Sequence, residues 1–167
     1  IIYSDKDDTL ESAVGAVLKA NKCTLSAAES CTGGLISSLI TSVSGCSEYY
    51  YGSVTSYANY VKQNVLGVPQ EIIEKHGAVS SECVAAMAEG VRRITGTDYS
   101  VATSGIAGPG GGSDEKPVGT VWIGVSSEKG TETYRLRFNS DRKRNIERFA
   151  SSALHILLKK LHKELNS

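Results

Sequence analysis

The stretch Ala27-Ala28-Glu29-Ser30-Cys31-Thr32-Gly33-Gly34 decides the fold of this 167-residue chain. Apolar and β-tolerant residues lead into it over residues 24–28, and a run with helical spacing follows it: Leu35, Ile36, Leu39, Ile40 and Val43. This pattern predicts a strand, a tight turn at the two glycines, and a helix that ends at Ser44-Gly45. The hydroxyl of Ser30 and the thiol of Cys31 are then expected where the strand ends and the helix begins.

Three roles are open for this turn. The first backbone N–H groups of a helix have no partner within the helix, and the helix dipole favours negative charge there. The simplest interpretation is that Ser30 or Thr32 caps the helix with its side-chain oxygen. Alternatively, the N–H groups bind a phosphate or stabilise an oxyanion. In the third interpretation the turn holds a nucleophile. This is either the hydroxyl of Ser30 or the thiol of Cys31, whose pKa a helix start would lower.

The rest of the chain alternates between strand and helix patterns. Strands are predicted at residues 24–29, 49–57, 99–104, 120–126 and 131–138. Helices are predicted at residues 10–21, after the glycine turn, from 58 to a break at 67–69, at 69–76, from Ser80 and from Asp141. The helix after Ser80 has the apolar stripe Val84, Met87, Ala88, Val91 and Ile94. The last helix has the stripe Ile146, Phe149, Ala150, Ala153, Leu154, Leu157, Leu158 and Leu161.

These patterns predict one α/β domain over residues 1–167, with a sheet between two layers of helices. The first three strands are connected through helices and should therefore be parallel. The last two are joined by Ser127-Glu128-Lys129-Gly130, a link short enough for an antiparallel hairpin. The expected fold class is a three-layer α/β/α architecture with a mixed, mainly parallel five-stranded sheet.

Composition and charge argue against several classes of function. The chain has 18 basic and 18 acidic residues, and this balance gives no support for binding to nucleic acid or to a membrane surface. No apolar run approaches the roughly 20 residues that cross a bilayer. The four cysteines form no C-x-x-C motif and the histidines lie apart from them, so no metal and no cofactor are predicted. Reduced thiols and the lack of a secretory segment favour a cytoplasmic location, and a first residue other than Met suggests a piece of a longer chain.

Three motifs are expected at the carboxyl ends of the first three strands, in residues 30–34, 57–62 and 104–112. Ligands of open α/β sheets bind beyond these strand ends. Residues 105–112 include five glycines, which allow a ligand to approach the backbone closely, although a flexible linker is the alternative. The sequence therefore predicts a binding site where the three motifs meet.

Lys62 is the candidate base for Ser30, because no histidine lies in a triad-like context and a desolvated lysine can be neutral near pH 7. Tyr57 would relay the proton or orient Lys62. The alternatives are a solvated surface lysine and a half-buried strand aromatic. Four basic residues, Arg142, Lys143, Arg144 and Arg148, lie at the helix end where the dipole disfavours them. One of these arginines is expected to bind an anion, unless the cluster is only a solvated helix face.

Several segments of the chain resemble the CinA C-terminal domain family, the pyridine-nucleotide deamidase module. They are residues 28–34, 57–62, 77–80, 104–109, 111–112, 116–121 and Asp141-Arg142. The resemblance covers nearly all of residues 8–162. It implies a mixed five-stranded sheet, no required metal, and a place in pyridine nucleotide salvage and NAD metabolism, in a family that includes competence/damage-inducible proteins.

The resemblance implies amide hydrolysis, in which nicotinamide mononucleotide and water give nicotinic acid mononucleotide and ammonia. By this likeness Ser30 is the nucleophile, Lys62 and Tyr57 activate it, and Ser104 belongs to the catalytic cluster. The substrate-binding residues that it implies are Cys31, Thr32, Gly33, Gly34, Asn59, Gly105 and Arg142. Ser104 stands where the family often has Thr, and Ile146 stands where it often has Arg.

The resemblance also bears on partners. It implies a pyridine mononucleotide substrate, and it is compatible with a homo-oligomer and with a preceding domain similar to molybdopterin-binding proteins. The alternative function is a nucleotide-binding regulatory domain of a two-domain protein, with little or no deamidase activity.

Overall fold

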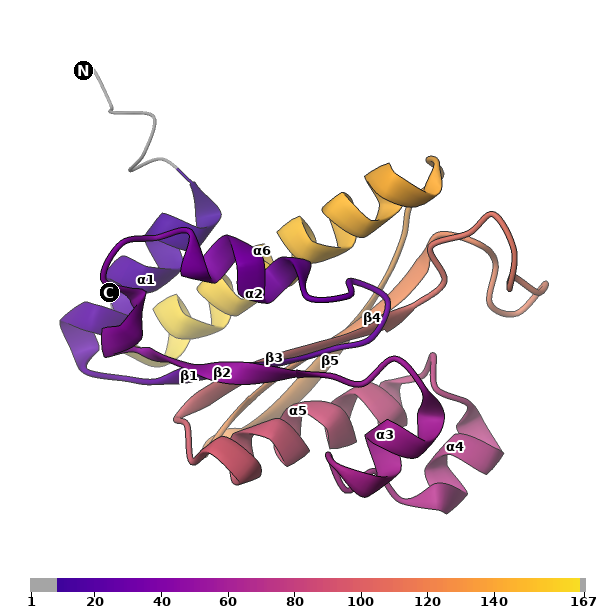
Figure 1. Ribbon diagram of the computed structural model, residues 1–167, viewed down its shortest axis with the longest axis horizontal. Coiled ribbons are helices and arrows are strands. Elements are labelled where there is room, and N and C mark those ends of the chain that lie inside the picture. Colours follow the sequence, from indigo (N-terminus) through magenta and orange to yellow (C-terminus); the bar gives the residue numbers. More distant parts are fainter. Residues whose placement is uncertain (1–8, 166–167) are drawn as a thin grey trace.

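The computed structural model describes residues 9–165, which form a five-stranded sheet with helices on both faces (Figure 1). The strands are β1 (Leu25–Glu29), β2 (Tyr50–Thr55), β3 (Tyr99–Gly105), β4 (Thr120–Ser127) and β5 (Gly130–Arg137). The helices are α1 (Leu10–Asn21), α2 (Leu35–Thr41), the short 3-10 helix η1 (Cys46–Glu48), α3 (Asn59–Asn64), α4 (Gln70–His76), α5 (Ser81–Thr95) and α6 (Arg142–Leu165).

The strand order in the sheet is β2-β1-β3-β4-β5. β1 is parallel to both of its neighbours, β2 and β3, whereas β4 is antiparallel to both β3 and β5. Among the described strands only β4 therefore runs against the others, which confirms the predicted mixed α/β/α fold and its hairpin. The carboxyl ends of β1, β2 and β3 consequently lie at the same edge of the sheet.

The two helical layers bury separate apolar clusters. Helices α1, α2 and α6 cover one face of the sheet, and α3, α4 and α5 cover the other (Figure 1). The first cluster includes Leu18, Ile40 and Phe149, and the second includes Leu66 and Met87. Met87 is therefore a core residue, as its place in the apolar stripe predicts.

Helix α2 is shorter than the sequence predicts. It ends at Thr41 rather than at Ser44-Gly45. The hydroxyls of Thr41 and Ser42 donate hydrogen bonds back to carbonyl oxygens of the last turn, at 2.9 and 2.6 Å. Such bonds offer the backbone an alternative to continuing the helix, and they end it here.

The apolar stripe of α5 is also shorter than predicted. Val91 is fully buried, but Ile94 is 51% exposed. Helix α5 ends at Thr95, and Gly96 adopts the left-handed conformation that turns the chain away toward β3. Ile94 therefore lies in a last turn that has left the core, and the prediction that it is a core residue is wrong.

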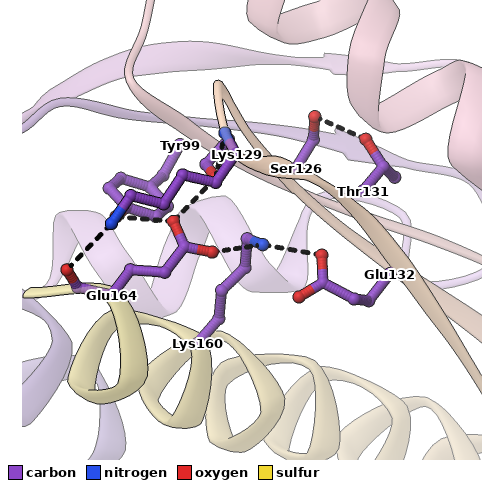
Figure 2. A network of polar contacts seen from close by, with 8 residues as sticks. Tyr99, Ser126, Lys129, Thr131, Glu132, Lys160 and Glu164 are labelled. Atoms are coloured by element: carbon purple, nitrogen blue, oxygen red, sulfur yellow. Dashed lines mark hydrogen bonds and ion pairs between the residues drawn. The ribbon is translucent and has the colours of Figure 1, made fainter.

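Helix α6 is fixed at its carboxyl end by a buried network of charged groups (Figure 2). Lys160 Nζ lies 2.7 Å from Glu132 Oε2 on β5 and 2.6 Å from Glu164 Oε2 on the same helix. The hydroxyls of Tyr99 and Ser127 donate to the other oxygen of Glu164, at 3.1 and 2.7 Å. The network ties the end of α6 to the sheet, while the first turn of α6 lies at the opposite edge, where β1, β2 and β3 end.

We expect the Glu164→Gln variant to be destabilised by about 2 kcal/mol at pH 7, because the buried Lys160 loses one of its two carboxylate partners. Burial by itself raises the pKa of Glu164, but the hydrogen bonds from Lys160 and Ser127 outweigh it and hold that pKa below the usual value. When the pKa of a carboxyl is lower in the folded than in the unfolded protein, its ionised form stabilises the fold. This stabilisation is fully present above the unfolded-state pKa and is lost as the pH falls through the folded-state pKa. Urea unfolding gives the free energy of unfolding at pH 7 and at pH 3. The difference between Glu164→Gln and wild type should be smaller at pH 3.

A matched control for this measurement is Glu48→Gln. Glu48 pairs with Lys19 at 3.5 Å, but both side chains are 59% exposed. Exposed pairs contribute about 0–1 kcal/mol. A Glu164→Gln variant no less stable at pH 7 than Glu48→Gln would contradict the role given to the buried network.

Candidate active site

A cavity of about 270 Å³ lies at the edge where β1, β2 and β3 end. Its walls come from the three predicted motifs, from the link between α4 and α5, and from the first turn of α6. The predicted site residues that line it are Ser30, Cys31, Tyr57, Asn59, Lys62, Ser104, Gly105 and Arg142. Thr32, Gly33 and Gly34 do not line it. The structure therefore brings together eight of the eleven predicted residues.

Ser30 and Lys62 are in direct contact within this cavity. Ser30 follows the last residue of β1, and Lys62 lies on α3. Lys62 Nζ donates hydrogen bonds to Ser30 Oγ at 3.0 Å, to the carbonyl oxygen of Ser56 at 2.6 Å and to that of Tyr57 at 3.1 Å. Two carbonyls thus hold the amine in place, and its third position faces the hydroxyl of Ser30.

Lys62 is only 1% exposed, so the interpretation as a solvated surface lysine is wrong. No carboxylate among the described residues lies within ion-pair distance of its Nζ. Burial lowers the pKa of Lys62 from its ordinary value, and the nearby Cys83 and Cys31 oppose this only in part. The amine is therefore closer to neutrality than an exposed lysine and suited to accept a proton.

Tyr57 lies at the mouth of the cavity rather than beside the amine. Its side chain is 62% exposed, and its hydroxyl accepts a hydrogen bond from Arg142 at 3.2 Å. Tyr57 contacts Lys62 through its backbone carbonyl, not through its phenol. The orienting role predicted for Tyr57 is thus performed by the main chain, and no contact within residues 9–165 supports the relay of a proton through the phenol.

Arg142 is the first residue of α6 and connects two sides of the cavity. One of its guanidinium nitrogens donates to the carbonyl oxygen of Gly108 at 2.8 Å, and the other donates to Tyr57. Asn59 is exposed at the start of α3 and also lines the cavity. The charged and polar groups that could hold an anionic ligand therefore gather at the mouth.

Ser104 and Gly105 form the end of β3 and a further wall of the cavity. Ser104 is 1% exposed, and its hydroxyl has no hydrogen-bond partner among the described residues. At Gly105 a Cβ atom would lie 2.6 Å from the carbonyl oxygen of Thr120, so only glycine fits this approach of β3 to β4. The Ser104 hydroxyl is thus available to a ligand.

The turn after β1 is organised by Glu29, a residue that the sequence analysis did not single out. Glu29 is fully buried, and its Oε1 accepts from Thr32 Oγ1 at 2.6 Å, from Gly34 N at 3.2 Å and from Ile36 N at 2.9 Å. Its Oε2 accepts from Ser37 N at 2.9 Å. A glutamate directly before the turn that opens a helix is the signal that could have revealed this role.

The capping interpretation of the turn is consequently wrong, and phosphate binding at the start of α2 finds no free donors there, whereas stabilisation of an oxyanion by the N–H groups before α2 stays a prediction. The N-cap of α2 is Gly34, which has no side chain to bond the helix, so neither Ser30 nor Thr32 caps α2. The first N–H groups of α2 also do not await an anionic ligand, because Glu29 already binds them. The Ser30 hydroxyl is left for the contact with Lys62.

Cys31 also differs from the prediction. Its thiol was expected to have a lowered pKa, but burial raises the pKa to about 12, and its hydrogen bond with Thr103 opposes this only in part. Cys31 is 7% exposed. A thiol with so high a pKa is almost entirely protonated at neutral pH and is a poor nucleophile.

Asn145 is a second residue that sequence analysis missed. It is fully buried one turn into α6, and its Nδ2 donates to the carbonyl oxygens of Ala107 and Ser140, each at 2.9 Å. Ala107 belongs to the glycine-rich loop that lines the cavity. Asn145 and Arg142 together attach this loop to α6, so the loop is a built wall and not a flexible linker.

Two structural features are absent from the described part of the chain. Residues 9–165 contain no cluster of three or more histidine, cysteine, aspartate or glutamate side chains that could hold a metal ion. In the same residues no helix has the length and apolar character required to span a membrane.

Comparison with known proteins identifies the family. The family model described as "CinA C-terminal domain" matches residues 7–161. A CinA-like protein of Salinibacter ruber is 51% identical over 153 residues, and a putative competence-damage inducible protein of Moorella thermoacetica is 46% identical over 160 residues. The alignments cover 92% and 96% of this chain but only 37% and 39% of these relatives, so the chain spans well under half of their length.

Solved structures agree over almost the whole chain. The crystal structure of a CinA superfamily protein from Klebsiella pneumoniae superposes with a TM-score of 0.90 and 34% identity, covering 96% of this chain and 99% of that one. A competence/damage inducible protein from Agrobacterium tumefaciens gives a TM-score of 0.88 and 32% identity, covering 95% and 97%. The chain therefore belongs to the CinA C-terminal domain family.

Proposed function

We propose that this chain is an amidohydrolase that deamidates nicotinamide mononucleotide, with Ser30 as the nucleophile and Lys62 as its base. The observation that carries the proposal is the 3.0 Å contact between Lys62 Nζ and Ser30 Oγ inside the cavity. Resemblance to the pyridine-nucleotide deamidase module supports the choice of substrate. The first requirement of the chemistry, a base that can take the proton of a serine, is met by a buried lysine without an acidic partner.

The hydrogen bonds of Lys62 favour transfer of a proton from the Ser30 hydroxyl to the Lys62 amine. A neutral amine has two N–H groups and one lone pair. The carbonyl oxygens of Ser56 and Tyr57 bind the two N–H groups, which leaves the lone pair for the hydroxyl hydrogen of Ser30. Lys62 takes this proton while Ser30 Oγ forms a bond to the carboxamide carbon, and the electron pair of the C=O bond moves to its oxygen.

The negative oxygen of the resulting intermediate needs hydrogen-bond donors. Ser30 N donates to the carbonyl oxygen of Thr103, but the N–H groups of Cys31 and Thr32 donate to no backbone carbonyl among the described residues. Of these two residues only Cys31 lines the cavity, so its N–H group is the proposed donor, and one such donor is typically worth about 3–4 kcal/mol in the transition state.

The remaining steps return the site to its starting state. The C–N bond breaks, and the nitrogen leaves as ammonia after taking the proton that Lys62 holds. Water then attacks the ester on Ser30 and gives a proton to Lys62. As the C–O bond to Ser30 breaks, that proton returns to the Ser30 oxygen, and nicotinic acid mononucleotide is released.

The lining of the cavity includes groups that suit both the ring and the phosphate of the substrate. Ala78, Val79 and Ile106 contribute apolar surface for a pyridine ring. The guanidinium of Arg142 would bind the phosphate, which would replace the hydroxyl of Tyr57 as its partner.

The test is an assay of this chain with nicotinamide mononucleotide, nicotinamide and NAD. Ammonia and nicotinic acid mononucleotide should form in equal amounts from the mononucleotide. Calorimetry that shows binding of the mononucleotide without ammonia release would contradict the proposal and favour the nucleotide-binding regulatory function.

We expect the Cys31→Ala variant to keep its deamidase rate within about fivefold of wild type, because the buried thiol is protonated at neutral pH and the backbone N–H remains. Steady-state kinetics at pH 7.5 measure this. Loss of the activity in Cys31→Ala together with its retention in Ser30→Ala would make the thiol the nucleophile.

A further inference from the structure

The carboxylate of Glu29 lies directly behind the nucleophile and binds only uncharged donors. Glu29 is the residue before Ser30, is fully buried, and accepts hydrogen bonds from three backbone N–H groups and one hydroxyl. No cation among the described residues lies within ion-pair distance of it. Burying such a charge is costly unless its hydrogen bonds are complete, so an exact set of donors must be kept around it.

The N–H groups of residues 30–37 fall into three sets according to their acceptors. Those of Gly34, Ile36 and Ser37 bind Glu29, and those of Ser30, Gly33 and Leu35 bind backbone carbonyls. Within the described contacts, only the N–H groups of Cys31 and Thr32 donate to neither. Gly33 and Gly34 have φ of +59° and +105°, which lets the chain reverse and bring the later N–H groups back onto the carboxylate.

We infer that Glu29 is a positioning residue for the reaction: its carboxylate holds the first turn of α2 so that the N–H group of Cys31, a residue that lines the cavity, stays directed at the oxyanion of the intermediate. This inference rests on the proposed function. Glu29 touches no reacting atom, and it acts through the turn that follows Ser30.

A carboxylate is required for this role, and an amide of the same shape is not sufficient. Both oxygens of Glu29 accept hydrogen bonds from backbone N–H groups. In Glu29→Gln one oxygen becomes an NH₂ group, which is a donor and cannot accept. It would face an N–H group of the turn, and the turn would have to open on that side. Cys31 and Thr32 would then move with it.

The experiment compares steady-state kinetics of Glu29→Gln and Glu29→Asp with wild type. We expect Glu29→Gln to lower kcat about 10- to 100-fold with KM within about twofold, because the oxyanion exists only in the transition state and the intermediate. The acid limb of the pH profile should not move, because Lys62 keeps its contacts. Glu29→Asp, which keeps the charge but is shorter, should recover part of kcat.

Thr9→Ala is the matched control, because Thr9 caps α1 through a hydrogen bond from Ser12 N at 3.1 Å and lies outside the cavity lining. It should lose stability and keep kcat. A folded Glu29→Gln protein with the kcat of wild type, or one whose loss is entirely in KM, overturns the inference. If Glu29→Gln does not fold, the same two results in a folded Glu29→Asp protein, namely the kcat of wild type or a loss entirely in KM, overturn the inference.

A second readout separates this inference from the proposed function. A fluorophosphonate probe reacts with an activated serine, with loss of fluoride, and its phosphoryl oxygen, which gains negative charge during the displacement, would occupy the same donor site. If wild type releases no ammonia from the mononucleotide, the proposed function fails, and the labelling of Ser30 still tests Glu29. Slower labelling of Glu29→Gln than of wild type supports the positioning role, whereas equal rates, or no labelling of wild type, overturn it.

Discussion

The Ser30→Ala variant should lose deamidase activity by about 10⁴-fold or more in kcat, because among the described hydroxyls that line the cavity only that of Ser30 contacts the proposed base. Ser30 Oγ contacts Lys62, and the Cys31 thiol, with a pKa of about 12, cannot replace it. Ammonia release from nicotinamide mononucleotide measures the loss. Binding of the mononucleotide, followed by calorimetry, should change little because Arg142 is untouched.

Ser100→Ala provides the control. Ser100 is a fully buried serine of β3 whose hydroxyl donates to the carbonyl oxygen of Ala88 at 2.5 Å, away from the cavity lining. Its loss should cost about 1 kcal/mol of stability and leave kcat unchanged. Equal rates in Ser30→Ala and wild type would reject Ser30 as the nucleophile.

The Lys62→Met variant is the second large effect. Met fills nearly the same volume but cannot accept a proton, and loss of a general base typically costs about 10²- to 10⁴-fold in rate. In wild type, the rate should rise with pH through the pKa of Lys62, since only the neutral amine accepts the proton from Ser30. Because burial lowers that pKa, the rise should occur below the pH at which an exposed lysine titrates. Lys62→Met should show a low rate without this rise.

Lys160→Met is the matched variant for Lys62→Met. Lys160 is also buried, at 5% exposure, but it pairs with Glu132 and Glu164 at the other end of the sheet. Burial by itself lowers the pKa of Lys160, but hydrogen bonds to both carboxylates reverse this and raise it. Lys160→Met should therefore lose stability and keep the pH profile. A Lys62→Met variant with the full rate and an unchanged profile would reject the base role.

Periodicity of apolar residues predicted most of the fold. The strands and the long helix after Asp141 follow from alternation and helical spacing, and the short link at residues 127–130 sets the antiparallel hairpin. The errors lie at helix ends. Thr41 and Ser42 end α2 through hydrogen bonds that compete with the helix, and hydrophobicity patterns do not contain such bonds.

The candidate site was predictable to the extent that its groups follow strand ends. Ser30, Lys62 and Ser104 were expected together because the carboxyl ends of parallel strands share an edge. The groups that hold them were not. The carbonyls of Ser56 and Tyr57 could belong to any residue type, since every residue has one. Glu29 and Asn145 were missed because their partners are backbone groups that only the folded turn and loop bring near.

The hydrogen bond between Tyr57 and Arg142 has a consequence for substrate entry. It joins two sides of the cavity mouth, yet both side chains are exposed, so water can take the place of either partner. Replacing such a hydrogen bond by hydrogen bonds to water has a net cost on the order of 1 kcal/mol. Admission of a nucleotide would then require two side chains to rotate, on a timescale of picoseconds to nanoseconds, and not a domain to open. Rotation of these two side chains would therefore not limit the rate at which a nucleotide enters.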